Sequence, residues 1–250
     1  MTYDFDVTGD GPAVLLLHST VCDRRMWDPQ VAALAAAGRR VVRLDLVGHG
    51  GTPVPAGRFD EAGGVAELLD GLGVGETALV GSSGGGRLAL EFAARWPGRV
   101  TALALLCTAL RGHGAGPELE AFDEREEALL EAGDVAGAVD LNVDLWVGPE
   151  ADDATRERVR VMQRHAFDVQ LAAEDVAYEP VRTDPDLSRI SAPTLLVTGA
   201  HDLPDFREIA VHLAGVLPKA QHVELAWAGH LPSLERPEEI NGLLLEFLAG

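Results

Sequence analysis

The sequence predicts an α/β protein with a mostly parallel, twisted sheet, helices on both faces of that sheet, and a helical insertion late in the chain. Short apolar runs of strand length alternate with helical patterns, and this alternation is typical of βαβ units. The alternation stops after residue 110, where acidic helical patterns replace it, and it resumes at about residue 189. With 250 residues, 47% of them apolar, the chain is long enough for one such core and an inserted subdomain.

Taken in order, the first apolar runs are Tyr3–Val7 and Ala13–Leu17, separated by a Gly-Asp-Gly-Pro turn. This pattern predicts a hairpin at the edge of the sheet. The later strands are expected at Val41–Leu44, Ala78–Val80, Thr101–Cys107, Thr194–Thr198 and His222–Ala226. The helices between them are expected at Trp27–Ala37, Phe59–Leu72, Leu88–Trp96, Asp205–Leu217 and Pro237–Leu248.

The predicted domain organisation is a core in two parts, residues 1–110 and 189–250, with a helical cap or lid at residues 111–188. The cap contains helical patterns at Leu119–Ala132 and Ala154–Ala173. Between Glu118 and Arg160 there are 14 acidic and 4 basic residues. We interpret this stretch as a solvated helical surface; the alternative is an acidic lid that discourages anionic substrates.

The formal net charge of −20 argues against nucleic acid or an anionic membrane surface as a partner. No apolar run approaches the roughly 18 residues that a membrane span requires. The N-terminal segment Met1–Asp6 lacks the features of a signal peptide, so a cytoplasmic location is expected. Cys22 and Cys107 lie far apart, so neither a disulfide framework nor a cysteine zinc site is expected, and both are interpreted as buried bystanders.

The segment Leu79–Leu90 carries the most informative motif: an apolar run enters a glycine-rich turn around serine, and an alanine-rich helix follows. Read as Gly-x-Ser-x-Gly, it predicts a nucleophile elbow, a sharp strand-to-helix turn that exposes a strained serine. The residues two before and two after that serine must be small. Gly81 and Gly85 meet this condition for Ser83, whereas Ser82 has Val80 two positions before it. Ser83 is therefore the predicted nucleophile.

A serine nucleophile needs a base and a group that orients the base. Asp202 follows a predicted strand in a Gly-x-x-Asp turn, and His230 follows a later strand after Gly229. The order Ser, Asp, His is the one expected with a nucleophile elbow. Asp202 is thus the predicted acid and His230 the predicted base, with Asp205 as the alternative acid.

The oxyanion of the tetrahedral intermediate needs backbone N–H donors. Gly84, at the start of the helix after the nucleophile, is one predicted donor. Thr20, in the loop after the Ala13–Leu17 strand, is the other. His18, which follows that same strand, is interpreted as packing under the site.

Together these segments resemble the α/β-hydrolase family with a helical cap. The matching pieces span nearly the whole chain except the cap: Leu15–His18, Met26–Asp28, Asp45–Gly50, Gly81–Gly85, Gly199–Asp202 and Gly229–His230. The resemblance implies a Ser-His-Asp hydrolase with no metal and no organic cofactor. The sequence departs from the family at Ser19, where glycine is usual, and at Gly84, where a bulkier residue often lines the pocket. Gly84 is expected to widen the acyl site.

The expected function is hydrolysis of a carboxylic ester or lactone of a small, mostly apolar substrate through an acyl-enzyme on Ser83. A C–C bond hydrolase or a perhydrolase with the same triad, and a slow-turnover ligand receptor on the same fold, are the alternatives. The expected partner is a small molecule, and a homo-oligomer is compatible with the sequence. The candidate pocket residues, each of which is otherwise an ordinary packing residue, are Trp27, Ser19, Trp146 and Phe122, with Phe167 and Tyr178 as further wall candidates.

A nucleotide-binding protein is disfavoured. Gly84–Ala89 fits Gly-x-Gly-x-x-Ala between a strand and a helix. That motif lies deep in the chain, and Val100–Leu110 holds no acidic residue to bind a ribose.

Overall fold

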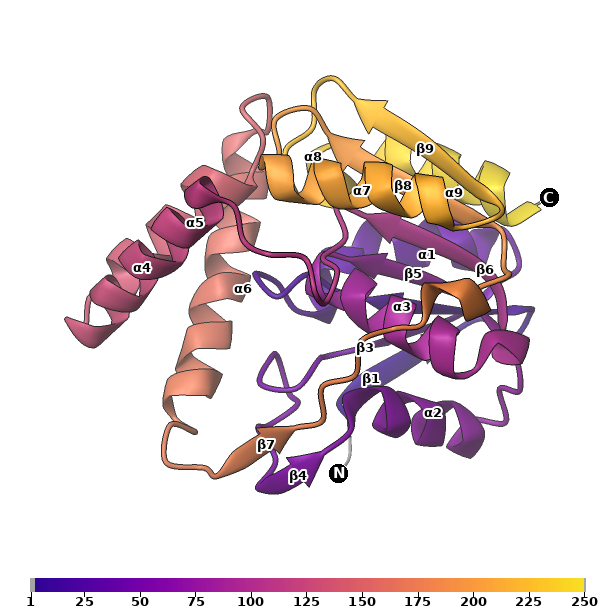
Figure 1. Cartoon of the computed structure of the whole chain (residues 1–250), viewed down its shortest axis with the longest axis horizontal. Coiled ribbons are helices and arrows are strands. Elements are labelled where there is room, and N and C mark those ends of the chain that lie inside the picture. Colours follow the sequence, from indigo (N-terminus) through magenta and orange to yellow (C-terminus); the bar gives the residue numbers. More distant parts are fainter. Residues whose placement is uncertain (1–2, 250) are drawn as a thin grey trace.

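The computed structural model describes residues 3–249 and contains a seven-stranded sheet in the order β1-β3-β2-β5-β6-β8-β9 (Figure 1). Strand β1 is antiparallel to β3, and every other neighbouring pair is parallel. The strands are β1 (Phe5–Thr8), β2 (Ala13–Leu17), β3 (Arg40–Leu44), β5 (Thr77–Ser82), β6 (Val100–Leu106), β8 (Thr194–Gly199) and β9 (Ala220–Leu225). Met1 and Thr2, which belong to the segment expected to lack a signal peptide, and Gly250 lie outside the described residues.

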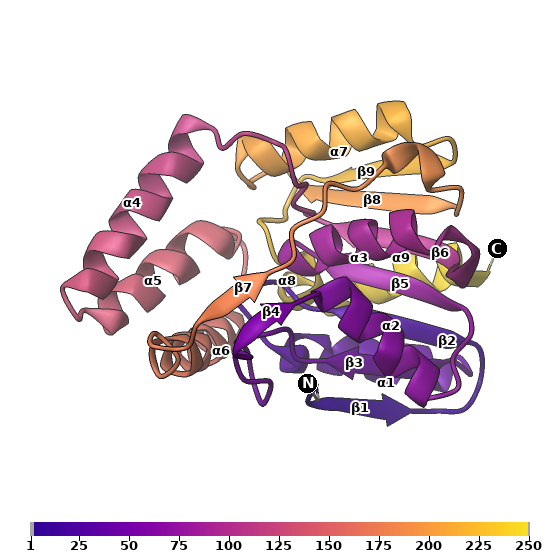
Figure 2. The same ribbon diagram turned by 60° about the horizontal axis from the view of Figure 1, so that its bottom comes forward.

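Helices cover both faces of the sheet, as the two views show (Figure 2). The core helices are α1 (Asp28–Ala36), α2 (Glu61–Gly71), α3 (Gly84–Arg95), α7 (Pro204–Val216), α8 (Pro232–Glu235) and α9 (Pro237–Ala249). Short 3₁₀ turns lie at Arg24–Trp27, Pro97–Arg99 and Leu187–Arg189. The predicted fold class, a mostly parallel sheet between two helical layers, is confirmed.

Alternate residues of each strand enter opposite core layers, because successive side chains of a strand point to opposite faces. In β2, Leu15 and Leu17 pack with α2, α3 and α7, whereas Val14 and Leu16 pack with α1 and α9. Both sets are completely buried. This two-sided burial explains why the central strands read as continuous apolar runs in the sequence.

The predicted hairpin between the first two strands is wrong. Strand β3 lies between β1 and β2, pairing antiparallel with β1 and parallel with β2. The glycines of the intervening turn allow the chain that enters β3 to pass closely. A Cβ atom on Gly9 would lie 2.2 Å from the carbonyl oxygen of Arg39, and one on Gly11 would lie 1.8 Å from that of Gly38. The turn therefore makes room for a third strand instead of closing a hairpin.

A group of three helices, α4 (Pro117–Glu131), α5 (Val135–Trp146) and α6 (Asp153–Leu171), lies beyond the carboxyl ends of the parallel strands (Figures 1 and 2). The predicted helices at Leu119–Ala132 and Ala154–Ala173 correspond to α4 and α6, while α5 is an addition. The chain then returns through β7 (Tyr178–Pro180), which pairs in parallel with β4 (Gly57–Phe59). The division of the chain at residues 110 and 188 stays a prediction. Within residues 3–249, every helix is too short or too polar to cross a lipid bilayer.

Candidate active site

Ser83 stands at the turn between β5 and α3, and its backbone has the strained geometry of a nucleophile elbow. Its φ of 52° and ψ of −117° are unusual for a residue with a side chain. Ser82 belongs to β5 and is completely buried. The backbone therefore singles out Ser83 of the two serines.

Two glycines make this turn sterically possible. A Cβ atom on Gly81 would lie 2.6 Å from the Cα of Gly86, and one on Gly85 would lie 2.3 Å from the carbonyl oxygen of Leu17. Real Cβ atoms do not approach backbone atoms so closely. The small residues on either side of Ser83 thus let β2, β5 and α3 pack tightly and hold the elbow.

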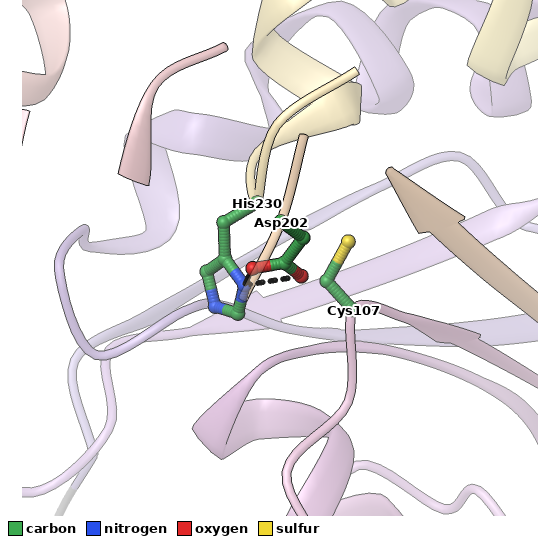
Figure 3. Close-up of side chains that lie close together, drawn as sticks. All are labelled: Cys107, Asp202 and His230. Atoms are coloured by element: carbon green, nitrogen blue, oxygen red, sulfur yellow. Dashed lines mark hydrogen bonds and ion pairs between the residues drawn. The ribbon is translucent and has the colours of Figure 1, made fainter. Parts of the chain in front are cut away.

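His230 and Asp202 form a buried pair (Figure 3). The Nδ1 atom of His230 lies 2.9 Å from Oδ1 and 2.8 Å from Oδ2 of Asp202. The two side chains are only 2% and 1% exposed. Because a carboxylate only accepts hydrogen bonds, the proton on this side belongs to Nδ1, which leaves Nε2 as the nitrogen that can take a proton.

Asp205, the alternative acid, is occupied elsewhere. Its Oδ1 accepts a hydrogen bond from the backbone N–H of Gly116 at 2.6 Å, and His113 Nε2 lies 3.9 Å from the same oxygen. Asp205 therefore holds the segment that leads into α4. Of the two candidate acids, Asp202 is the one that contacts His230.

Glu235, which the sequence reasoning missed, holds the loop that carries His230. Its carboxylate accepts hydrogen bonds from the N–H of Gly229 at 2.9 Å and of Leu231 at 3.1 Å, on either side of the histidine. Burial raises the pKa of Glu235 above its ordinary value, against the effect of these donors. The only sign of this role in the sequence is that Glu235 follows His230 by five residues. A single glutamate in a helical pattern ordinarily indicates a solvent-exposed position.

Aromatic rings fix the His230 imidazole from two elements. Trp146 of α5 has its ring centroid 4.6 Å from that of His230, and Phe206 of α7 has its centroid 4.2 Å away. The backbone N–H of His230 also donates to the carbonyl of Trp146 at 3.0 Å. The cap helix α5 is thus in direct contact with the imidazole.

Thr20 and Gly84, the predicted oxyanion donors, meet beside Ser83. Gly84 is the first residue of α3, where backbone N–H groups lack a helical partner. A Cβ atom on Gly84 would lie 2.6 Å from Cγ2 of Thr20. The expectation that Gly84 widens the acyl site is therefore wrong, because the Thr20 methyl group occupies that space.

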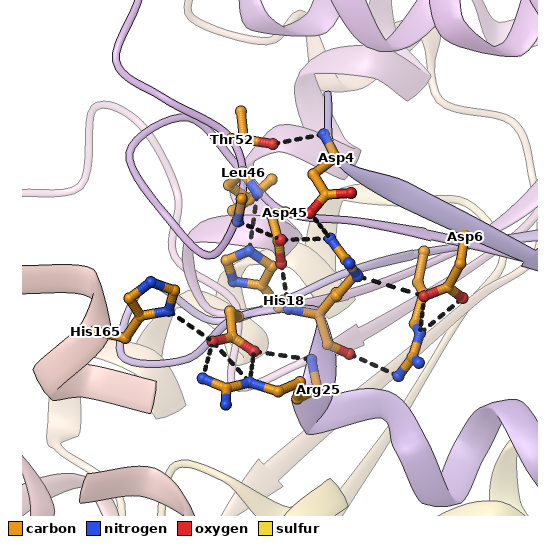
Figure 4. Close-up of polar contacts among 12 residues, drawn as sticks. Asp4, Asp6, His18, Arg25, Asp45, Leu46, Thr52 and His165 are labelled. Carbon is orange, nitrogen blue, oxygen red and sulfur yellow. Dashed lines mark hydrogen bonds and ion pairs between the residues drawn. The ribbon is translucent and has the colours of Figure 1, made fainter. Parts of the chain in front are cut away.

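The loop that carries Thr20 is fixed by the Asp45–Gly50 segment. His49 Nε2 lies 2.9 Å from the carbonyl oxygen of Thr20. Asp45, at the end of β3, accepts hydrogen bonds from the N–H groups of Arg24 and Gly51, both at 2.8 Å (Figure 4). This network ties the two loops together next to the elbow.

His18 lies beneath these loops, completely buried (Figure 4). Its Nε2 accepts a hydrogen bond from the N–H of Leu46 at 2.8 Å, so its Nδ1 carries the proton and donates to the carbonyl of Ser19 at 2.8 Å. Burial, reinforced by the neighbouring His49, lowers the pKa of His18 to about 3. As the sequence predicts, His18 packs under the site, in the neutral form.

A cavity of about 440 Å³ joins the elbow, the oxyanion loop and the cap. Ser83, His230, Thr20 and Gly84 all line it. The cap, the core loops and helices α3 and α7 contribute the rest of the wall, which is more polar than the sequence indicates: Val21, His49, Arg87, Ala109, Leu119, Phe122, Asp123, Glu126, Asn142, Trp146, Gln163, Phe167, Gln170 and Phe206.

The candidate pocket residues divide into two groups. Phe122, Trp146 and Phe167 line the cavity. Trp27 and Ser19 do not, because both are completely buried. Trp27 lies in the core layer with α1 and α9, and Ser19 lies in the loop before Thr20, where its N–H donates to the sulfur of Met26. Their predicted pocket role is wrong, because the Trp27 ring packs into the hydrophobic core and Ser19 is completely buried.

Cys107, Asp202 and His230 offer ligand atoms that all lie within 4.8 Å of one another (Figure 3). The donor set does not fit a metal ion. Burial raises the pKa of the Cys107 thiol well above its ordinary value, so the sulfur keeps its proton, and Asp202 and His230 already satisfy each other. The cluster is an acid–base pair backed by a buried thiol. Cys22 and Cys107 are both buried and unbridged, as expected.

The chain belongs to the alpha/beta hydrolase family, whose model matches residues 14–243, and it is an enzyme of that family. It is 28% identical to a carboxylesterase of Bacillus subtilis (strain 168), covering 96% of this chain and 81% of the relative. Among solved structures, an enol-lactonase from Burkholderia xenovorans LB400 is 26% identical with a TM-score of 0.80, covering 99% of this chain and 96% of that one. A thermophilic esterase from Thermogutta terrifontis is 29% identical with a TM-score of 0.82, covering 99% and 93%.

Proposed function

We propose that this enzyme is a serine hydrolase that cleaves a carboxylic ester or lactone of a small molecule through an acyl-enzyme on Ser83. One observation carries the proposal: Ser83, which has a strained backbone, lines the same cavity as His230, and Nδ1 of His230 is hydrogen-bonded to the buried carboxylate of Asp202. This is the arrangement that activates a serine hydroxyl. The names of the esterase and enol-lactonase relatives support the same substrate class.

In the proposed reaction, His230 Nε2 takes the proton of Ser83 as its hydroxyl oxygen attacks the carbonyl carbon. Asp202 keeps the Nδ1 proton in place and stabilises the imidazolium that forms. The backbone N–H groups of Gly84 and Thr20 stabilise the oxyanion. His230 then gives its proton to the leaving alkoxide and later takes one from water, which attacks the acyl-enzyme and frees Ser83.

The cap, residues 111–188 in the predicted division, serves as a lid in this proposal. Phe122 on α4, Trp146 on α5 and Phe167 on α6 line the cavity opposite the elbow. Such a lid excludes water from the developing charge and shapes the acyl pocket. Its contact with the imidazole through Trp146 couples the closed position of the lid to the alignment of the base.

The test is turnover of 4-nitrophenyl acetate and of a small δ-lactone by the wild type and by the Ser83→Ala variant. We expect many turnovers per active site for at least one substrate, all lost in the variant. Turnover no faster than the release of a bound complex supports a ligand receptor instead. Inactivity on both, with cleavage of a dicarbonyl C–C bond or formation of a peracid, supports one of the other triad reactions.

A further inference from the structure

A second cavity, of about 390 Å³, adjoins the catalytic one, and Arg87 lines both. Three guanidinium groups from separate parts of the chain meet there: Arg87 on α3, Arg111 in the loop after β6, and Arg182 after β7. We call these three residues the arginine corner. In a protein with a net charge of −20, such a gathering of cations beside the candidate active site needs an explanation.

In the part of the chain that the structure describes, no carboxylate pairs directly with these guanidinium groups, although Glu61 and Glu91 lie near Arg87. Among residues 3–249, none of the three forms an ion pair or a side-chain hydrogen bond, and Arg111 Nε is buried without a partner. Arginines elsewhere are typically engaged, as Arg95 is with Asp60 at 2.6 Å and Arg43 with Asp6 at 2.9 Å. Arg87 and Arg111 are partly buried, whereas Arg182 is exposed. Leaving a partly buried guanidinium without a partner costs desolvation free energy.

Two carboxylates also line the second cavity, but both have other partners. Glu61 accepts a hydrogen bond from the N–H of Val47 at 3.0 Å, and Glu91 lies 3.4 Å from Arg95. Three cations and two anions leave one positive charge in excess. The hydroxyl of Tyr178 completes the polar wall. Tyr178 thus lines this cavity and not the catalytic one, which corrects its candidacy for the catalytic pocket.

Arg87 is placed to reach a molecule bound at Ser83. It follows Ser83 by four residues, its N–H donates to the Ser83 carbonyl at 3.0 Å, and both residues line the catalytic cavity. Four residues of helix rise by about 6 Å. Burial and the positive charge of Arg111 lower the pKa of Arg87; the carboxylates of Glu61 and Glu91 oppose this shift, and Arg182 adds to it. A bound anion would relieve the repulsion among the three guanidinium groups.

We propose that the arginine corner binds a carboxylate carried by the substrate, so that the natural ester or lactone is an anionic, carboxylate-bearing compound. Guanidinium groups suit this role because their planar fork binds a carboxylate through two hydrogen bonds. The inference rests on the proposed function and narrows its substrate class. It replaces the expectation of a mostly apolar substrate. Asp123 and Glu126 of the acidic segment line the catalytic cavity, so the arginine corner must hold the substrate carboxylate away from them.

Two pairs of esters test the proposal, each differing only in an anionic or neutral end. In the acyl pair, mono-4-nitrophenyl adipate is compared with the 4-nitrophenyl ester of adipic acid monoamide. In the alcohol pair, 4-acetoxyphenylacetate is compared with 4-acetoxyphenylacetamide. We expect kcat/KM of the wild type to favour the anionic member of at least one pair by about tenfold or more, the effect of hydrogen bonds to a charged group. That preference should fall to near unity in Arg87→Gln.

Arg125→Gln is the matched control, because this substitution also removes one positive charge. Arg125 is exposed on α4 and lines neither cavity. It should keep the wild-type ratio. If Arg87→Gln cleaves neither member, the same ratio is measured in Arg111→Gln and Arg182→Gln. The proposal is overturned if the wild-type ratio of kcat/KM, anionic member over neutral member, is at or below one in both pairs. It is also overturned if Arg87→Gln, Arg111→Gln and Arg182→Gln all retain the preference for the anionic member.

The two proposals fail in different ways. If both members of each pair are cleaved equally well and the activity is lost in Ser83→Ala, the carboxylate subsite is contradicted and the serine-hydrolase proposal stands. Cleavage of neither member, together with inactivity on 4-nitrophenyl acetate, removes the serine hydrolase and the subsite with it.

Discussion

His18 and His230 are both completely or almost completely buried histidines in loops that follow a strand, yet their surroundings fix them in opposite roles. His18 accepts a backbone N–H at Nε2 and donates to a backbone carbonyl from Nδ1, so both nitrogens are used. His230 donates from Nδ1 to the carboxylate of Asp202, and its ring lines the catalytic cavity. Because both nitrogens of His18 are bonded to backbone groups, His18 supports the fold, whereas the carboxylate on Nδ1 of His230 leaves its Nε2 available for proton transfer.

The largest expected effect is on His230. In His230→Ala, the base is lost, and kcat/KM for a hydrolysed ester should fall by about 10⁴-fold or more. Steady-state kinetics on the best ester measures it. His18→Asn, which keeps one donor and one acceptor, is the contrasting variant and should stay within about tenfold of the wild type in the folded protein. Equal losses in both variants contradict the assigned roles.

Asp202 should come next. Asp202→Asn keeps the shape of the side chain but offers an amide to Nδ1, which favours the wrong tautomer, and a loss of about 10⁴-fold in kcat is expected. Asp205→Asn is the matched control, because its Oδ1 can still accept the Gly116 N–H. It should retain kcat within a few-fold. The reverse pattern would make Asp205 the catalytic acid.

Substitution of Glu235 should produce a smaller effect, because this residue acts only by holding the loop that carries His230. In Glu235→Gln, one of the two carboxylate oxygens that accept the Gly229 and Leu231 N–H groups becomes an amide donor, so the His230 loop shifts. We expect kcat to fall by up to about 100-fold, with a loss of about 1.5–3 kcal/mol in the free energy of unfolding. Because Glu235 acts through His230, KM should change little. A large rise in KM with unchanged kcat would instead place Glu235 in substrate binding.

The smallest effect on catalysis belongs to His18, which instead contributes a pH dependence of stability. Its pKa is about 3 in the folded protein, below the ordinary value of 6.5, so between these pH values the unfolded chain binds more protons. The free energy of unfolding should therefore fall as the pH drops from about 6.5 toward 3, by up to about 1.4 kcal/mol per pH unit from this group. Denaturant titrations at several pH values measure the slope, which should be shallower in His18→Asn. An unchanged slope would mean that His18 is protonated in the folded protein over this range, which contradicts its neutral, buried assignment.

The elements that the sequence predicts correctly are those encoded by local pattern. Ser83 could be distinguished from Ser82 because the steric demand falls on its own neighbours, Gly81 and Gly85. The strand-to-loop positions of Asp202 and His230 are equally local, and the structure brings these two side chains into contact.

What the sequence could not predict depends on residues far apart in the chain. The insertion of β3 between β1 and β2 is invisible in the turn that joins the first two strands. Trp27 looks the same in sequence whether its ring faces the core or the cleft. The convergence of Arg87, Arg111 and Arg182 requires the return of the chain after the cap, which the pairing of β7 with β4 positions.

The most direct measurement of the central claim is intact-protein mass spectrometry after exposure to a small fluorophosphonate. The wild type and His18→Asn should each gain one adduct rapidly, Ser83→Ala should gain none, and His230→Ala should react far more slowly. This result would establish a serine that is activated by His230 and not by His18. An adduct that survives Ser83→Ala, or one that forms equally fast without His230, would contradict the account.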